Sequence, residues 1–440
     1  MTRFDHTSLV LFLLSYWNLG FLILVILEMK DFCKNYLQVE PSSLQTVSAI
    51  LMLPWSFKVI YAMLSDSVPI LGFRRKYYLI FNGFISFFSC ALIFPDYFHH
   101  LVYVVAFLTV CQMAAASTDI IVDSIMVKEA KKDPERGSED LNSISVLTMG
   151  VAGVAGAIIG AFFTQYVHPK WGILLYSMVG LSIFLGALKF NEEKVRHQVG
   201  LDSLKGSLRQ MKEAVKSPII TNMLWFQFLT GAVVPRFQEF KYFFLLDVVL
   251  MPEFNYALLF ILSSISLIGL TLIFHYVFKH YSYRQGFAIA FMITTLTTVT
   301  DIIFVMGLHR RFYINDYVFL LCTNLFEDML SNRYTIICAG VVHMRIAPQA
   351  VEATVLALLA GASNLGFGVV GPIFGNFWAY MLGLSSRNLG DLYVALVIKL
   401  LFSLVPLLFL GFVPNKEDID KDEDLKRLNA AEESKKHLLV

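Results

Sequence analysis

The chain has 440 residues, of which 57% are hydrophobic and only 16% are charged. A soluble globular domain carries about 45–50% apolar and about 25% charged residues, so this composition excludes an ordinary soluble fold. The formal net charge of +1 does not suggest a nucleic-acid partner. The five cysteines show neither CxxC nor Cys/His ligand spacing, and we therefore predict no metal site, no cofactor and no disulfide framework.

The hydrophobic residues gather in blocks of about 20 residues or more, each long enough to cross a hydrocarbon core of about 30 Å as a helix. These blocks predict an all-α polytopic membrane protein with about twelve transmembrane helices. The expected spans lie at 8–28, 42–64, 77–95, 101–127, 142–166, 171–189, 218–246, 254–279, 285–307, 314–342, 349–383 and 389–413.

Two polar segments divide this pattern. One falls after about six spans and the other forms a tail that is rich in Lys, Asp and Glu, which is the two-halved plan of secondary transporters. The sequence therefore predicts an N-terminal six-helix bundle at 1–190, a linker at 191–217, a C-terminal six-helix bundle at 218–413 and a charged tail at 414–440.

The linker carries apolar residues at helical spacing. They are Leu201, Leu204, Leu208, Met211 and Val215. This spacing is typical of an amphipathic helix that lies on the inner face of a membrane. A solvated linker with chance spacing fits equally well, because Gly206 weakens a helix.

Lysine and arginine are distributed unevenly over the connecting segments. The side that holds both termini and the linker carries about 24 of them, and the other side about 6. Because basic residues stay on the inner side, we expect both termini in the cytosol or its organellar equivalent, with either the plasma membrane or an organelle membrane as the site.

The loop after the second span places an acid before a basic cluster. Asp66 is followed by Gly72, Arg74 and Arg75. A carboxylate at this helix end can pair with the cluster or cap a neighbouring helix. We interpret the motif as a latch of the inner gate, which breaks when a transporter opens inward; the alternative is a solvated, positively charged loop.

Three charged residues lie deep inside the second and fourth spans. Lys58 and Asp119 are each about 12–13 Å from the inner ends of their spans, so the two can pair. Asp123 shares a helical face with Asp119 at i, i+4 spacing. It is then the less compensated acid and a candidate proton carrier, whereas the alternative is a static salt bridge within the bundle.

The tenth span carries further charges. Glu327 and Asp328 fall near mid-membrane, where substrate sites are expected, and Arg333 lies nearer the inner end. The tenth span is the repeat partner of the fourth, so the acids of the fourth span and Arg333 of the tenth can face one another across a central cavity. Pro235-Arg236 predicts a break in the seventh span, where freed carbonyl groups can line that cavity.

Glycines repeat on the fifth and eleventh spans, where they allow helices to approach closely. They are Gly150, Gly153, Gly156, Gly160, Gly361, Gly366, Gly368, Gly371 and Gly375. Two more charged residues within spans, Asp301 and Lys399, have no partner that the sequence identifies.

Several separated motifs occur together and in one order over about residues 20–410. They are Pro54-Trp55 with Lys58, Ser65-Asp66 with Pro69, Gly72 and Arg74-Arg75, Asp119 with Asp123, Pro235, the run 348–354, and Asn364-Leu365-Gly366. In these motifs the chain resembles the folate–biopterin transporter family of the major facilitator superfamily. It departs from the family at Ala62 and Ala350, where glycine is frequent.

The resemblance implies a major facilitator fold and the transport of folates, pterins or related compounds, not an enzymatic activity. A pterin presents a ring N–H beside an amino group, which a carboxylate can accept as a bidentate pair. The acids that can supply it are Asp119, Glu327, Asp328 and Glu352. Lys58 or Arg333 can neutralise the carboxylates of folate.

We therefore expect a proton-coupled secondary transporter that works by alternating access, with a folate- or pterin-like small molecule, protons and the lipid bilayer as its partners. A facilitator for a different small solute and a transport-inactive scaffold subunit remain as alternatives. A membrane enzyme would need a nucleophile and a base at catalytic spacing, which His99-His100 and His309 do not provide.

Overall fold

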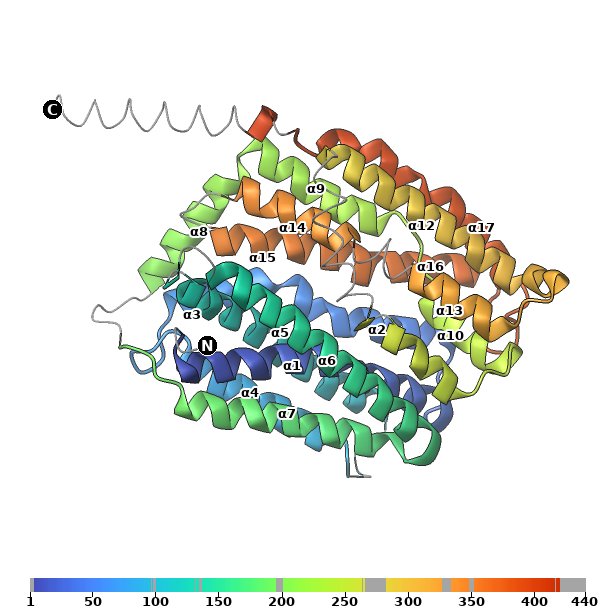
Figure 1. The fold of residues 1–440 in the computed structure, drawn as a ribbon, viewed down its shortest axis with the longest axis horizontal. Helices are drawn as coiled ribbons and strands as arrows, with labels where there is room; N and C mark the ends of the chain where they lie inside the picture. Colours follow the sequence, from blue (N-terminus) through green and yellow to red (C-terminus); the bar gives the residue numbers. More distant parts are fainter. Residues whose placement is uncertain are drawn as a thin grey trace.

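The computed structural model describes residues 4–95, 97, 100–130, 132–133, 137–194, 201–262, 264–265, 282–326, 334–347, 352–415 and 417–419. These residues form long helices that run along one axis of the molecule (Figure 1). Eight of the described helical stretches are long and apolar enough to cross a membrane. The prediction of an all-α protein with many membrane spans is therefore confirmed.

The described residues of the first half of the chain form the following helices. They are α1 (His6–Asp31), η1 (Phe32–Tyr36), α2 (Pro41–Ser56), α3 (Lys58–Ser67), α4 (Lys76–Ala91), α5 (Leu101–Ala130), α6 (Gly137–Tyr166) and α7 (Pro169–Lys189). Helix starts follow ordinary local chemistry. Asp5 caps α1 by accepting a hydrogen bond from the Ser8 amide at 2.9 Å, and Pro41 and Pro169 occupy first turns, where an N–H is not needed.

The rest of the described chain is also helical. Its elements are α8 (Leu201–Val215), α9 (Pro218–Ala232), α10 (Gln238–Phe243), η3 (Phe244–Val248), the helix Glu253–Leu262, α12 (Tyr283–Val305), η4 (Leu308–Phe312), α13 (Asp316–Phe326), α14 (Tyr334–Ile346), α15 (Glu352–Asn364), η6 (Leu365–Val370), α16 (Gly371–Met381), α17 (Leu392–Ser403) and η7 (Val405–Phe412). The linker residues that show helical spacing thus form α8, which contacts α3, α9 and α15.

Helices from the same part of the sequence pack together. Helix α1 packs against α6 and α7, and α4 against α5 and α7, whereas α9 packs against α15 and α12 against α17. In Figure 1 the first group lies in the lower part of the view and the second group in the upper part. Helix α2 lies between them, since it contacts α5 on one side and α10, α15 and α16 on the other.

The bundle has two chemically different ends. Helix α1 begins and α8 lies at the left end in Figure 1, and we call this the basic end because it carries Arg74, Arg75 and Lys76. We call the other end, which holds η1, η3 and η4, the opposite end.

Close helix contact depends on glycine at the positions that the sequence singled out. In α16, a Cβ atom on Gly375 would lie 1.8 Å from the Arg236 carbonyl oxygen, so no other residue fits there without moving the backbone. The predicted packing role of the eleventh-span glycines is confirmed at this position.

Candidate functional site

The second span breaks in the middle of the bundle. Helix α2 ends at Ser56 and α3 begins at Lys58, and Phe57 between them leaves helical geometry with φ −103° and ψ 20°. Pro54 lacks an N–H and so weakens the helix one turn earlier. The break turns backbone carbonyls toward α15, where Asn364 donates a hydrogen bond to the Trp55 oxygen at 3.1 Å.

Lys58 and Asp119 form an ion pair at this break, as their equal depth predicts. The Lys58 and Asp119 side chains are 15% and 9% exposed, so the pair is largely removed from solvent. The Lys58 ammonium also lies 4.6 Å from the centre of the Trp55 ring. The Trp55 indole in turn donates to Gln112 at 3.2 Å, which joins α2 to α5 beside the pair.

Asp123 has a partner that the sequence did not identify. The Tyr16 hydroxyl on α1 donates to Asp123 Oδ1 at 2.5 Å. Asp123 is therefore held by a neutral donor, whereas Asp119 on the same helical face is held by a cation. A tyrosine inside an apolar span gives no charge signal, which is why the sequence did not reveal this contact.

The loop between α3 and α4 is organised by a carboxylate other than the expected one. Glu192 Oε2 accepts hydrogen bonds from the amides of Arg75 and Lys76, at 3.0 and 2.9 Å, and so caps the start of α4. Within the described residues, Asp66 makes no direct ion pair with Arg74 or Arg75, and the role of this loop as a latch stays a prediction.

Asp66 still influences the basic cluster. Burial lowers the pKa of the Arg75 guanidinium, and the nearby carboxylates of Asp66 and Glu192 oppose that effect. Gly72 has φ +86°, which allows the tight turn that brings the cluster back toward Asp66. The acid and the arginines thus interact through space, across a loop that is tied to the linker by Glu192.

The charged residues Asp301 and Lys399 do have partners, which corrects the sequence interpretation. Lys241 of α10 contacts Asp301 of α12 at 2.5 Å, and Lys399 of α17 lies 3.7 Å from the other oxygen of the same carboxylate. Three helices of the second half therefore meet at one buried acid.

The predicted break in the seventh span is present. Helix α9 ends at Ala232 and α10 begins at Gln238. In the gap, the Arg236 amide donates to the Gly371 carbonyl at 3.1 Å, and the Arg236 guanidinium carbon lies 3.1 Å from the centre of the Phe367 ring. The broken segment is thus fixed against η6 and α16.

Charged contacts also join the two groups of helices at the opposite end. Lys30 at the end of α1 lies 3.1 Å from Glu239 of α10, and Lys34 of η1 lies 2.6 Å from Asp247 of η3. Ser48 of α2 donates to the same Glu239 at 2.9 Å. These residues were not predicted from the sequence, although the charged run Glu28-Met29-Lys30-Asp31 at the end of the first span was a visible signal.

Part of the predicted site lies beyond what the structure describes. Glu327, Asp328 and Arg333 are outside the described residues, as is the side chain of Glu352 at the start of α15. Among the residues that are described, no group of three His, Cys, Asp or Glu side chains could hold a metal ion.

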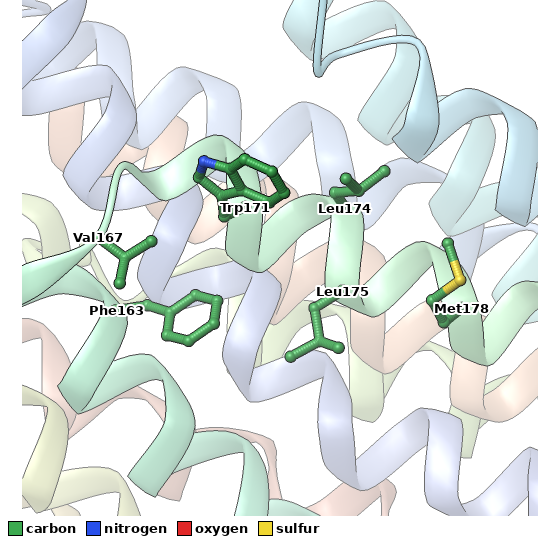
Figure 2. A pocket seen from close by; sticks show the side chains of 6 residues that line it. All are labelled: Phe163, Val167, Trp171, Leu174, Leu175 and Met178. Atoms are coloured by element: carbon green, nitrogen blue, oxygen red, sulfur yellow. The ribbon is translucent and has the colours of Figure 1, made fainter.

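A groove of about 320 Å³ lies away from the candidate site, between α6 and α7 (Figure 2). Its lining is wholly apolar: Phe163, Val167, Trp171, Leu174, Leu175 and Met178. Trp171 and Met178 are exposed on the outside of the bundle, so this groove fits contact with lipid and not the binding of a polar solute.

The BT1 family model matches residues 20–432, which is nearly the whole chain. The chain belongs to the BT1 family, the folate–biopterin transporter family. The predicted family membership is confirmed, and the family is one of transporters, not of enzymes.

Two relatives from this family illustrate the likeness. The chain is 26% identical to a folate-biopterin transporter of Synechocystis over 96% of this chain and 85% of that protein. It is 25% identical to probable folate-biopterin transporter 5 of Arabidopsis thaliana over 87% of this chain and 78% of the relative.

Solved structures show the fold. A point mutant of the nucleoside transporter NupG matches with a TM-score of 0.71 and 15% identity over 93% of this chain and all of that one. The D-xylose–proton symporter matches with a TM-score of 0.68 and 12% identity over 92% and 98% of the two chains. The predicted major facilitator fold is thereby confirmed.

Proposed function

We propose that this BT1 family protein is a secondary active transporter of folate, a pterin or a related small organic anion, that it is coupled to protons, and that it works by alternating access. In this proposal the bundles 1–190 and 218–413 are the two halves that move, and the linker 191–217 and the tail 414–440 lie with both termini on the cytosolic or equivalent side. The distribution of lysine and arginine supports this orientation. The printed names of the Synechocystis and Arabidopsis relatives support the substrate class.

The observation that carries the proposal is the Lys58–Asp119 pair at the break of the second span. Its neighbours are an indole, from Trp55, and the eleventh span, where Asn364 holds the Trp55 carbonyl. A flat heterocycle can stack on an aromatic ring, and a carboxylate can accept two parallel N–H groups from it. The pair lies where the two groups of helices meet, as expected of a substrate site in this kind of transporter.

The same pair offers a chemical exchange on substrate binding. A substrate carboxylate can take over the Lys58 ammonium, which frees Asp119 to accept N–H donors from a pterin-like ring. Both side chains are buried, so a substrate that displaced only one of them would leave the other charge without a partner. Binding therefore favours a substrate that supplies both a carboxylate and N–H donors. Glu327, Asp328, Arg333 and Glu352 stay candidates for further substrate contacts.

For coupling, we propose Asp123 as a proton carrier. It forms no ion pair among the described residues, and a hydroxyl donor such as Tyr16 can bind the charged form and, with its own oxygen, accept from the neutral form. A proton taken up from one side and released to the other would couple the gradient to substrate movement.

Uptake into proteoliposomes tests the proposal. The purified protein should accumulate radiolabelled folate or biopterin when a pH gradient is imposed, and a protonophore should abolish the accumulation. Lys58→Met should reduce uptake by more than about tenfold, whereas Arg209→Met on the exposed linker helix should leave it unchanged. Transport of another small solute without either compound would favour a facilitator of different specificity, and a folded protein that moves no solute would favour a scaffold subunit.

A further inference from the structure

Helix α1 ends at the opposite end in a set of contacts that cross between the two groups of helices. We call these contacts the opposite-end gate. It consists of Lys30–Glu239, Lys34–Asp247 and Asn35–Glu253, whose contacting nitrogen and oxygen atoms are 3.1, 2.6 and 2.5 Å apart. Around the gate, residues of η1, α10 and η3 belong to one continuous buried hydrophobic cluster. The structure is therefore closed at this end.

Glu28 lies beneath this gate, and its carboxyl group has no hydrogen-bond partner among the described residues. Its side chain is 0% exposed, and neither carboxyl oxygen is within hydrogen-bonding distance of a donor among the described residues. It occupies a space made by Gly172 of α7, where a Cβ atom would lie 2.4 Å from Glu28 Cγ and 2.8 Å from Oε1. The neighbouring Leu27 belongs to one buried hydrophobic cluster with Ala257 from the second half of the chain.

Two acids near Glu28 carry charge of its own sign. Asp31, one turn further along α1, and Glu253, from the helix of the second half, are close enough to repel a negative charge on Glu28. Both carboxylates accept hydrogen bonds from a single donor group, the Asn35 amide, at 2.6 and 2.5 Å. Closing the gate thus brings acids from both halves together.

The cations and other titratable groups nearby are engaged elsewhere. Lys30 is held by Glu239 and by the Tyr256 hydroxyl, at 3.1 and 3.3 Å. The Lys170 ammonium of α7 lies 5.7 Å from the centre of the Phe32 ring, and the ring of His168, which precedes α7, lies tilted against Tyr36 with 4.3 Å between the ring centres. None of these groups forms a hydrogen bond with the Glu28 carboxyl.

An ionised carboxylate that is buried without a partner is strongly disfavoured, whereas a neutral carboxyl is much easier to bury. We propose that Glu28 is a proton-binding residue of the transport cycle, and that the opposite-end gate closes over Glu28 when this carboxyl holds a proton. When the gate opens, water reaches the carboxyl and it can ionise. The step is the addition of one proton to one carboxylate oxygen, with no other bond made or broken.

The inference goes beyond the role proposed for Asp123, because it places proton binding at the other end of α1 and links it to a particular movement. It rests on the proposed function in one respect, namely that the proton bound by Glu28 is part of the transport cycle. Closure of the gate can be measured without substrate or gradient, so a failure of one proposal can be told from a failure of the other.

Spin-label distance measurements across the gate provide the test. The labels are attached at Tyr166→Cys and Tyr313→Cys, which are exposed positions at the opposite end on either side of the gate, with Cys322→Ser to remove the exposed native thiol. In the otherwise unaltered protein, the ratio of closed to open molecules should fall as the pH rises, by up to about tenfold per pH unit for one proton. In Glu28→Gln, which mimics the neutral acid, the closed form should dominate at every pH.

Glu40→Gln is the matched control. Glu40 is an acid at the same end, but both of its oxygens accept hydrogen bonds from Ser386, at 2.8 Å each, so the pH response should persist in this variant. Size-exclusion profiles and thermal melts establish that each variant is folded. A Glu28→Gln protein whose distances still titrate like those of the unaltered protein would overturn the proposal, as would an unaltered protein whose distances do not depend on pH. A normal pH response of the gate with no proton-driven uptake would instead refute the proposed coupling.

Discussion

Removing one partner of the Lys58–Asp119 pair should destabilise the protein far more than removing both. The two side chains are 15% and 9% exposed, so each single change leaves a buried charge behind. Breaking a buried pair in this way costs about 3–5 kcal/mol, and Lys58→Met also loses about 0.5–2 kcal/mol from the contact with the Trp55 ring. We expect Lys58→Met with Asp119→Leu to be less harmful than the sum of the single changes by at least about 2 kcal/mol.

Equilibrium unfolding of the four proteins in mixed micelles measures this coupling energy. The exposed pair Arg209–Glu213 on α8 is a suitable control, because its side chains are 83% and 56% exposed and its contact is 3.2 Å. A double-mutant cycle on this control should give only about 0.3–0.5 kcal/mol. If the Lys58 and Asp119 changes add to within about 0.5 kcal/mol, the two residues are not coupled and the reasoning from burial is wrong.

Three further changes test separate parts of the site. Asp123→Asn should abolish pH-driven accumulation and spare exchange at equal concentrations; intact accumulation in the same liposomes would reject this acid as the carrier. Asp66→Asn should shift the balance of inward and outward accessibility to cysteine labelling without loss of expression. Glu192→Gln should instead lower the free energy of unfolding by about 1 kcal/mol, because the start of α4 loses its cap. Identical effects of the two changes would show that the two acids do not have these separate roles. Gly361→Val should lower the melting temperature, because a Cβ atom there would lie 2.4 Å from the Ser56 carbonyl oxygen and overpacking costs about 1–3 kcal/mol; an unchanged melt would show that the break of the second span is not tightly packed.

A contact between two charges was predictable from the sequence where regular helix joins each residue to the inner end of its span, as α3 does for Lys58 and α5 for Asp119. A helix rises about 1.5 Å per residue, so the depth of Lys58 and of Asp119 follows from counting toward the ends of their spans. Charges that lie deep in apolar spans also need partners, which narrows the choice to the few that share a depth. These two constraints suffice for this pair, and the structure forms it.

Depth counting fails where a break lies between a residue and the end of the span from which its depth is counted. Lys241 follows the gap between α9 and α10, in which the chain advances without a regular helical rise. Its distance from the membrane surface therefore cannot be read from the residue number, and its contact with Asp301 was missed. The same limit applies to caps: Glu192 reaches the start of α4 only because the linker folds back on the loop, which no local pattern encodes.

Neutral partners are also invisible when only charges are compared. Asp123 was taken as the less compensated acid because a sequence shows cations but does not show which hydroxyl faces a carboxylate. Glu28 went unnoticed because an acid at the end of a span is expected to reach water. Only the packing of α7 and of the helix Glu253–Leu262 shows that its carboxyl group is buried.

Helix α1 connects the two candidate proton-binding acids. Tyr16, which holds Asp123, and Glu28 lie about 18 Å apart along one continuous helix, and Gly20 between them is so close to α6 that a Cβ atom would lie 2.1 Å from the Met149 carbonyl oxygen. In the proposed transport cycle, we expect a helix packed this tightly to move as part of its own half and not to bend independently at each acid. The Lys30–Glu239 contact joins α1 to α10 directly, so in the same proposal it would transmit that movement to the other half. If both proposals hold, protonation at either acid acts on the same rigid body. The surroundings distinguish the two acids: Asp123 has a hydrogen-bond donor in this structure, whereas Glu28 has none within the part of the chain that the structure describes.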